Sequence, residues 1–268
     1  MKIMNELRKY FAIAYISAKA NLAYASEVGS RLFFLAIILY IFMRLWKITY
    51  QNAGTNVLGG LTLNEMLWYL VVTESICMSS PRISQLVDED VRTGTIAVQL
   101  VRPLSYPLYR LFACLGERYV RFVVTLAAGS VIAFYLVGPF AASAINLVAF
   151  LVAVPLAFIL DFLGYFLVGL GAFWMEDTSG AMLIYSRLTM ILGGMLIPLQ
   201  LFPSAVRPLL EHLPFASIVY GPARMFVKPD ATALLGLYAN QLFWILIMGA
   251  AVAFVYAKAT KRIAAQGG

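Results

Sequence analysis

Long apolar runs alternate with short polar segments along most of the chain. The runs predict six membrane-spanning helices, at about residues 31–47, 64–80, 107–137, 144–174, 182–201 and 233–256. Each run reaches the roughly 17–25 residues with which an apolar helix crosses a bilayer. Pro155 is expected to kink the fourth span, and the fifth should break at the 193–194 glycine pair.

Two segments do not fit this pattern of spans. Residues 1–30 mix lysine and arginine with apolar side chains, which predicts an amphipathic helix in the headgroup region rather than a plain soluble tail. Residues 202–232 contain five prolines and are too apolar for a free loop, so we expect a re-entrant or interfacial helical hairpin on the outer side. The fold class is therefore an all-α polytopic membrane protein, with one transmembrane domain over residues 1–268.

The longest charged interruption is the segment 84–106. It begins as a short amphipathic helix whose apolar stripe is formed by Ile83, Leu86, Val87 and Val91. Asp88, Glu89 and Arg92 lie off the stripe, with Asp90 at its edge. Gly94 stands where the helix should stop, because glycine tolerates the left-handed conformation. A short helix between two spans is well placed to bind a soluble partner.

Composition and charge agree with a membrane protein. Hydrophobic residues make up 62% of the chain and charged residues 12%, against roughly 45–50% and 25% in soluble domains. The net charge of +7 is concentrated in predicted inner loops, which places both termini in the cytoplasm by the positive-inside rule. The acidic turn 175–180 and the basic residues of the outer hairpin depart from that rule. No basic-aromatic platform occurs in a soluble region, so nucleic-acid binding is not expected.

Motifs for chemistry are missing from the sequence. It has no G-x-x-x-x-G-K-[ST] loop, no G-x-S-x-G elbow and no HExxH. Cys77 and Cys114 have no metal-binding spacing, and His212 is the only histidine. We expect neither an enzyme nor a metal site, and no cofactor in this chain.

The intramembrane charges that the sequence singles out are Glu74, Asp161 and Arg187. Glu74 and Asp161 lie near mid-depth, and Arg187 lies nearer the inner end. Charges at such depth are costly, and they usually face a bundle interior or a wet cavity. They indicate either a substrate or ion pathway or a structural contact between helices.

Short motifs carry a resemblance to a known family. They are the inner link DEDVRTGTI at 88–96 with LVRPL at 100–104, and LPF at 213–215 with Pro222 after it. With the predicted spans, this arrangement resembles the ABC type-2 exporter permeases of bacteria over nearly the whole chain.

The resemblance implies a permease without a nucleotide site, so that ATP and Mg²⁺ bind in a separate cytoplasmic ABC ATPase subunit. Two permease chains, identical or homologous, would pair in the lipid of the plasma (inner) membrane. Each would dock on an ATPase through the inner link, called the coupling helix. By position, the residues entering a groove on the ATPase would be Glu89, Asp90, Arg92, Thr93 and Gly94. ATP-driven closure would then open a path for export.

Two alternatives remain open at this point. An ion-coupled secondary transporter could use Glu74 and Asp161 as a proton relay, although matched interrupted helices in repeated halves are not evident. A membrane assembly factor that transports nothing would also fit the spans.

Overall fold

The computed structural model describes residues 2–22, 25–140, 143–228 and 231–266. In this part the fold is all-α apart from one hairpin of two-residue strands, β1 (Val57–Leu58) and β2 (Leu61–Thr62). The α-helices are α1 (Lys2–Leu22), α2 (Ala25–Ala53), α3 (Leu63–Met78), α4 (Ile83–Arg92), α5 (Thr95–Val101), α6 (Tyr106–Val137), α7 (Ala144–Leu170), α8 (Ser179–Leu192), α9 (Arg207–His212), α10 (Pro214–Ile218), α11 (Tyr220–Val227) and α12 (Ala231–Gln266). Short 3-10 turns, η1 (Gly171–Phe173) and η2 (Leu199–Leu201), follow α7 and α8.

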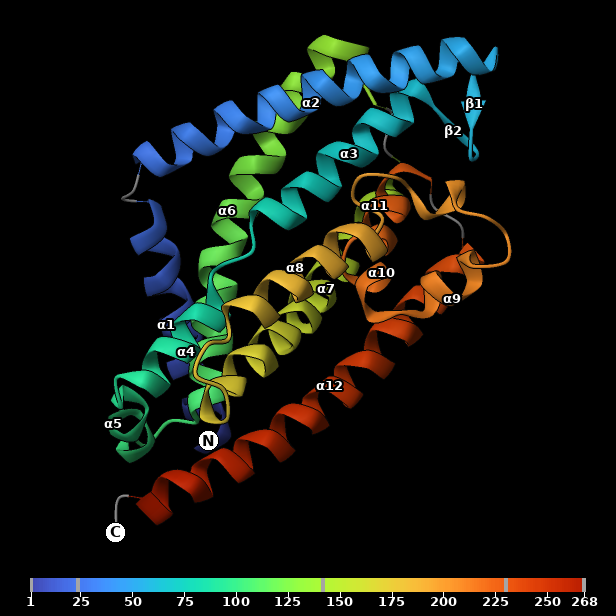
Figure 1. Cartoon of the computed structure of the whole chain (residues 1–268). Helices are drawn as coiled ribbons and strands as arrows, with labels where there is room; N and C mark the ends of the chain where they lie inside the picture. Colours follow the sequence, from blue (N-terminus) through green and yellow to red (C-terminus); the bar gives the residue numbers. More distant parts are fainter. Residues whose placement is uncertain (1, 23–24, 141–142, 229–230, 267–268) are drawn as a thin grey trace.

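The long helices run between two ends of the molecule (Figure 1). At one end lie α4, α5, the turn from α7 to α8, and both chain termini. The β-hairpin and α9–α11 lie at the other end, and α12 runs from one end to the other. We call the first the α4–α5 end and the second the hairpin end.

Four of the described helical segments are long and apolar enough to cross a membrane. They are Gly29–Ala53, Tyr106–Val137, Ala144–Phe173 and Ala233–Lys261. The two other predicted spans appear as shorter helices, α3 with 16 residues and α8 with 14. The predicted break in the fifth span is confirmed, because α8 ends at Leu192 and Gly194 has a φ of 70°.

Capping residues and glycine explain where α3 begins and where α4 ends. Thr62 accepts a hydrogen bond from the Glu65 backbone N–H, while the Glu65 carboxylate accepts one from the Thr62 N–H, which forms a capping box before α3. α4 ends at Arg92, and Gly94 has a φ of 71°, as predicted for the end of this helix. α2 begins at Ala25, earlier than the predicted span, and contains Arg31. A flexible basic side chain can extend to the interface from a position within a helix, so Arg31 does not mark the start of α2.

The predicted N-terminal amphipathic segment is helical over α1, and it packs along the first half of α6. The ring of Tyr10 stacks on Phe112 with centroids 5.4 Å apart, and its hydroxyl accepts a hydrogen bond from the Ser105 backbone N–H at 3.1 Å. The backbones come very close where Ala14 faces Gly116, since a Cβ on Gly116 would lie 2.0 Å from the Ala14 carbonyl oxygen. α1 therefore has a defined position on α6.

The predicted hairpin 202–232 contains three short helices, α9, α10 and α11, which fold back on the long helices. Asn146 of α7 donates a hydrogen bond to the Phe226 carbonyl at 2.9 Å, and Gln241 of α12 donates one to the Ser217 carbonyl at 2.9 Å. Buried amides thus satisfy backbone groups that the broken helices leave unpaired.

Candidate functional site

The α4–α5 corner, α4 and α5 together, presents an exposed polar tip. Glu89, Arg92, Thr93 and Gly94 are all exposed. On α5, Val98 and Val101 add exposed apolar surface, and Val101 is 86% exposed. The opposite side of the corner is buried in a small core formed by Ile83, Val87, Ile96, Tyr106, Cys114, Phe162, Phe166, Leu170 and Val252. The corner thus combines a free surface with a rigid base.

Asp90 does not lie on the exposed surface with the other predicted coupling residues. It is only 8% exposed, and its Oδ2 accepts a hydrogen bond from the Tyr106 hydroxyl at 2.5 Å. Arg110 forms an ion pair with the same carboxylate. Asp90 therefore joins α4 to the start of α6 inside the chain, so the exposed group is Glu89, Arg92, Thr93 and Gly94.

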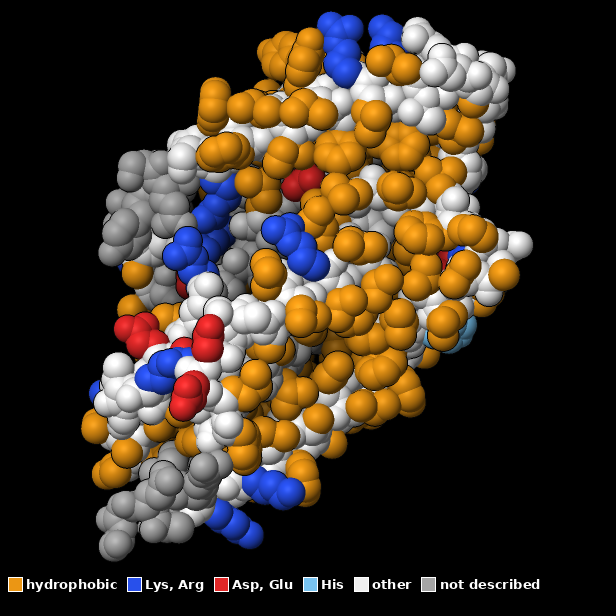
Figure 2. Space-filling view, viewed as in Figure 1, with side chains coloured by type: hydrophobic (Ala, Val, Ile, Leu, Met, Phe, Trp, Pro, Cys, Tyr) orange, Lys and Arg blue, Asp and Glu red, His pale blue; other side chains and the backbone are white. Residues whose placement is uncertain are grey.

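A polar clip joins α4 to the turn between α7 and α8. The buried hydroxyl of Thr178 donates a hydrogen bond to Asp88 at 2.7 Å. Arg92 forms an ion pair with Asp88 at 2.7 Å, and it reaches Asp177 at 4.0 Å. Hydrogen bonds from the hydroxyl and backbone N–H of Ser179 lower the pKa of Asp177, so this turn stays anionic. Figure 2 shows acidic side chains gathered around a basic one in this region.

Close packing also fixes α4 against the end of α7. A Cβ added at Gly169 would lie 2.8 Å from Val87 Cβ and 2.9 Å from the Ser84 carbonyl oxygen. Only glycine leaves enough space for the two helices at this point. The corner therefore has direct contacts with α6, α7 and the α7–α8 turn.

Deeper in the bundle, Arg118 and Asp161 form a buried ion pair. The Nη1–Oδ2 distance is 2.8 Å, and the residues are 1% and 2% exposed. Arg118 also donates to the Ile76 carbonyl at 3.3 Å and lies 4.1 Å from the Phe158 ring centroid. Ser80 donates to Asp161 at 3.3 Å. Arg118 Nε and Asp161 Oδ1 have no hydrogen-bond partner, so the pair retains unused polar atoms.

The three intramembrane charges predicted from the sequence line one cavity of about 250 Å³. Glu74 comes from α3, Asp161 from α7 and Arg187 from α8, and Arg118 of α6 completes the charged lining. Glu74 is 3% exposed, and no hydrogen bond or ion pair reaches it within the described residues. Arg187 is exposed and contacts the Met190 sulfur at 3.6 Å. The structure therefore groups these residues without pairing Glu74.

A second hollow of about 470 Å³ connects this cavity with the α4–α5 end. Four residues line both hollows: Cys77, Ser80, Tyr165 and Ser186. Asp88 and Asp177 of the polar clip line the second hollow as well. We call the larger hollow the vestibule. It lies between the α4–α7–α8 contact and the cavity that holds the buried charges.

Sequence reasoning missed Arg118, which forms the ion pair with Asp161. Arg118 lies within the third predicted span, 107–137, but the sequence analysis did not identify it as an intramembrane charge. The signal was the proline at 107, which starts a helix that is 32 residues long. Counted from Tyr106, Arg118 lies about 18 Å along α6, deep enough to reach Asp161.

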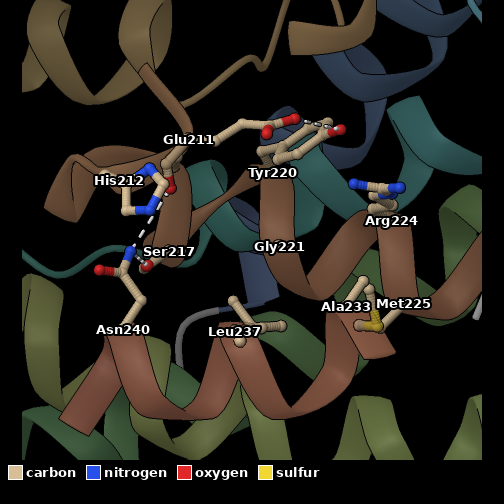
Figure 3. A pocket seen from close by; sticks show the side chains of 12 residues that line it. Glu211, His212, Ser217, Tyr220, Gly221, Arg224, Met225, Ala233, Leu237 and Asn240 are labelled. Carbon is tan, nitrogen blue, oxygen red and sulfur yellow. Dashed lines mark hydrogen bonds between the residues drawn. The ribbon is translucent and has the colours of Figure 1, made fainter. Parts of the chain in front are cut away.

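A third pocket, of about 220 Å³, lies at the hairpin end between α9–α11 and α12 (Figure 3). Two pairs of its polar side chains are hydrogen-bonded to each other. Tyr220 donates to Glu211 at 3.4 Å, and Asn240 donates to Ser217 at 2.7 Å. In the described part of the chain, no cluster of three His, Cys, Asp or Glu side chains could hold a metal ion.

Comparison with known proteins agrees with the geometry. The sequence model of one family, described as ABC-2 family transporter protein, matches residues 34–267. No curated protein matches the chain. The match covers α3, the α4–α5 corner, the buried charges and the hairpin end, and most of the chain in total. The family implies an ATPase partner. The chain belongs to the ABC-2 transporter family and is a multi-pass membrane permease of an ABC transporter.

Proposed function

We propose that the chain is the six-span permease subunit of an ATP-driven exporter in the bacterial inner membrane. It pairs with a second permease, identical or homologous, and both of its termini lie in the cytoplasm. Each α4–α5 corner docks on a cytoplasmic ABC ATPase, which binds ATP and Mg²⁺. The chain itself hydrolyses no ATP and needs no cofactor.

The observation that carries this proposal is the construction of the α4–α5 corner. Its tip is exposed, while its base is joined to α6 through Asp90, to α7 at Gly169, and to the α7–α8 turn through Thr178. A push on the tip therefore reaches α6, α7 and the α7–α8 turn at once. Such a rigid joint lets closure of two ATPase subunits move the spans between two arrangements.

The short helices α3 and α8 are compatible with six spans. At 1.5 Å per residue they extend about 24 Å and 21 Å, short of a hydrocarbon core of about 30 Å. At the hairpin end, the chain after α8 continues through the turn at Gly194 and η2, where the Tyr69 hydroxyl donates to the Gly194 carbonyl at 2.5 Å. Irregular backbone at membrane depth is tolerated where protein buries it, so the turn at Gly194 and η2 extend the fifth span beyond α8.

The cavity and the vestibule form the proposed substrate pathway. Glu74 and Arg187 offer charges to a substrate, whereas Asp161 is held by Arg118 and sets the shape of the cavity. Substrate enters through the vestibule from the cytoplasm or inner leaflet and leaves toward the hairpin end.

Charge reversal at the tip tests the docking step. Glu89→Lys should reduce co-purification of the ATPase and abolish its stimulation by the permease, because the exposed carboxylate contacts the ATPase groove. Lys258→Glu, an exposed charge reversal on α12, is the matched control and should leave both unchanged. If the ATPase binds Glu89→Lys as well as the unchanged chain, docking occurs elsewhere.

The unpaired Glu74 gives one alternative a specific basis. A buried carboxylate in a wet cavity could carry a proton, as in an ion-coupled secondary transporter. That function predicts substrate uptake into vesicles driven by a pH jump in the absence of ATP. The exporter proposal predicts no uptake under those conditions and transport only with the ATPase and ATP.

A further inference from the structure

Glu74 is a deeply buried acid whose charge nothing in the described chain neutralises. Burial of an isolated charge is costly, and proteins usually compensate it with a partner. Asp161 has such a partner in Arg118, at 2.8 Å, but Glu74 has none among the described residues. Asp161 Oδ1, which is also buried, lacks a donor as well. The cavity therefore contains two acceptors without a donor.

The cations around the cavity do not cancel this acidity. Arg118 is engaged by Asp161 and the Ile76 carbonyl, and it lies over the Phe158 ring. Arg187 is exposed and forms no ion pair with Glu74. Among the charged groups that line the cavity, Glu74 is the one that is both buried and without an ion pair in the described chain.

The rest of the lining combines hydroxyl side chains, from Ser80, Tyr165, Ser186 and Thr189, with adaptable apolar ones. Three methionines contribute, together with two branched residues from the hairpin end: Met78, Met190, Met195, Ile218 and Val219. Flexible, polarizable methionine side chains fit ligands of varied shape. A pocket with one unpaired buried carboxylate beside a flexible apolar wall favours a ligand that carries one positive charge and an apolar part.

We propose that this cavity binds an amphiphilic organic cation, whose amine or quaternary ammonium group lies against Glu74 and whose apolar part contacts the methionines. The ligand arrives through the vestibule, whose charged lining is Arg82, Asp88 and Asp177. This inference rests on the proposed permease function and names the substrate class of the same pathway.

Cys77 allows a direct test, because its side chain lines both the cavity and the vestibule and follows Glu74 by one helical turn. Cys114 is buried outside both hollows, so a Cys114→Ala chain has one reactive thiol to follow. The full-length permease in detergent is treated with two methanethiosulfonates, one bearing a quaternary ammonium and one a sulfonate. The measured quantity is the ratio of the two labelling rates, in which changes in thiol reactivity cancel.

The cationic reagent should label Cys77 faster, and Glu74→Gln should lower the ratio by at least about fivefold, since a charge one helical turn away acts across a low dielectric. Benzyltrimethylammonium should slow labelling by a neutral reagent, and benzenesulfonate should not. Glu65→Gln, on the same helix, keeps its capping contact as glutamine and should leave the ratio unchanged. Arg187→Gln should raise the ratio.

An equal ratio for Glu74→Gln and the unchanged chain would overturn the inference, because Glu74 would then be neutral or would not face the ligand. Protection by benzenesulfonate rather than by the ammonium compound would also overturn it. These measurements need no ATPase. A failure here therefore leaves the docking proposal intact, and a failure of the Glu89→Lys test leaves the labelling result intact.

Discussion

The Arg118–Asp161 pair is the strongest residue-level constraint in the bundle. Each group is nearly fully buried, and each depends on the other for compensation of its charge. Loss of one member of a buried pair is far more damaging than replacement of both, because a single substitution leaves an isolated charge.

We predict that Asp161→Leu lowers the free energy of unfolding by about 3–5 kcal/mol, while the double change Arg118→Met with Asp161→Leu recovers most of that loss. Denaturant unfolding of the detergent-solubilised chain measures both. Arg187→Met is the control for removal of an arginine that is exposed, and its effect should stay within about 0.5 kcal/mol. A double variant as unstable as the single one would show that the pair is not a unit.

Residue-level prediction from sequence succeeded where a pattern carried the information. Hydropathy marked Glu74 and Asp161 as deep charges, and both line the cavity. The inward direction of Asp90 could not be read from its place at the edge of a helical stripe. That direction depends on Tyr106 and Arg110, which approach from another helix.

At the scale of elements, the contact between α4 and α7 decides whether the corner moves with the bundle. Gly169→Ala should push α4 away, because its Cβ would meet Val87 and Ser84 at under 3.0 Å. We expect the ATPase to remain bound through the exposed tip. The permease should, however, no longer stimulate ATP hydrolysis by the ATPase. Co-purification and ATP hydrolysis by the reconstituted complex measure the two effects separately.

Gly236→Ala on α12 is the matched control, since a Cβ there meets nothing within 4 Å. It should leave stimulation unchanged and raise stability by up to about 1 kcal/mol from helix propensity. Full stimulation in the Gly169→Ala complex would mean that force reaches the spans by another contact.

The position of α1 on α6 is a second element-level feature that sequence could not give. Amphipathicity predicted a helix, but the partner surface depends on the gap at Gly116. Gly116→Ala should displace α1, because its Cβ would overlap the Ala14 carbonyl oxygen. Limited proteolysis should then cleave within residues 2–22 faster, whereas Gly180→Ala, where a Cβ meets nothing within 4 Å, should not change cleavage.

At the scale of the whole molecule, the basic residues at the hairpin end explain why the charge pattern was ambiguous. Arg207 pairs with Glu211 at 2.9 Å, and the Lys228 ammonium donates to the Gly60 carbonyl at 2.8 Å. Arg224 lies 5.9 Å from the Tyr220 ring centroid. These cations are held by local partners, but so are Arg92 and Arg110 of the inner link, so local pairing does not separate the two ends of the molecule. A count of basic residues in the sequence does not distinguish a cation with a local partner from one without.

The Lys228–Gly60 contact joins the end of α11 to the β1–β2 hairpin, which lies between α2 and α3. Both must therefore lie on one side of the membrane. The α4–α5 corner lies at the opposite end of the molecule (Figure 1).

We therefore predict that, in a chain lacking Cys77 and Cys114, an impermeant maleimide labels Asn56→Cys in intact cells. Ala97→Cys, exposed on α5, should react only after the membrane is opened. Lys258→Cys should behave like Ala97→Cys, since the C-terminal part of α12 lies at the α4–α5 end of the molecule. Labelling of Ala97→Cys in intact cells would place the corner outside and remove it from any cytoplasmic ATPase.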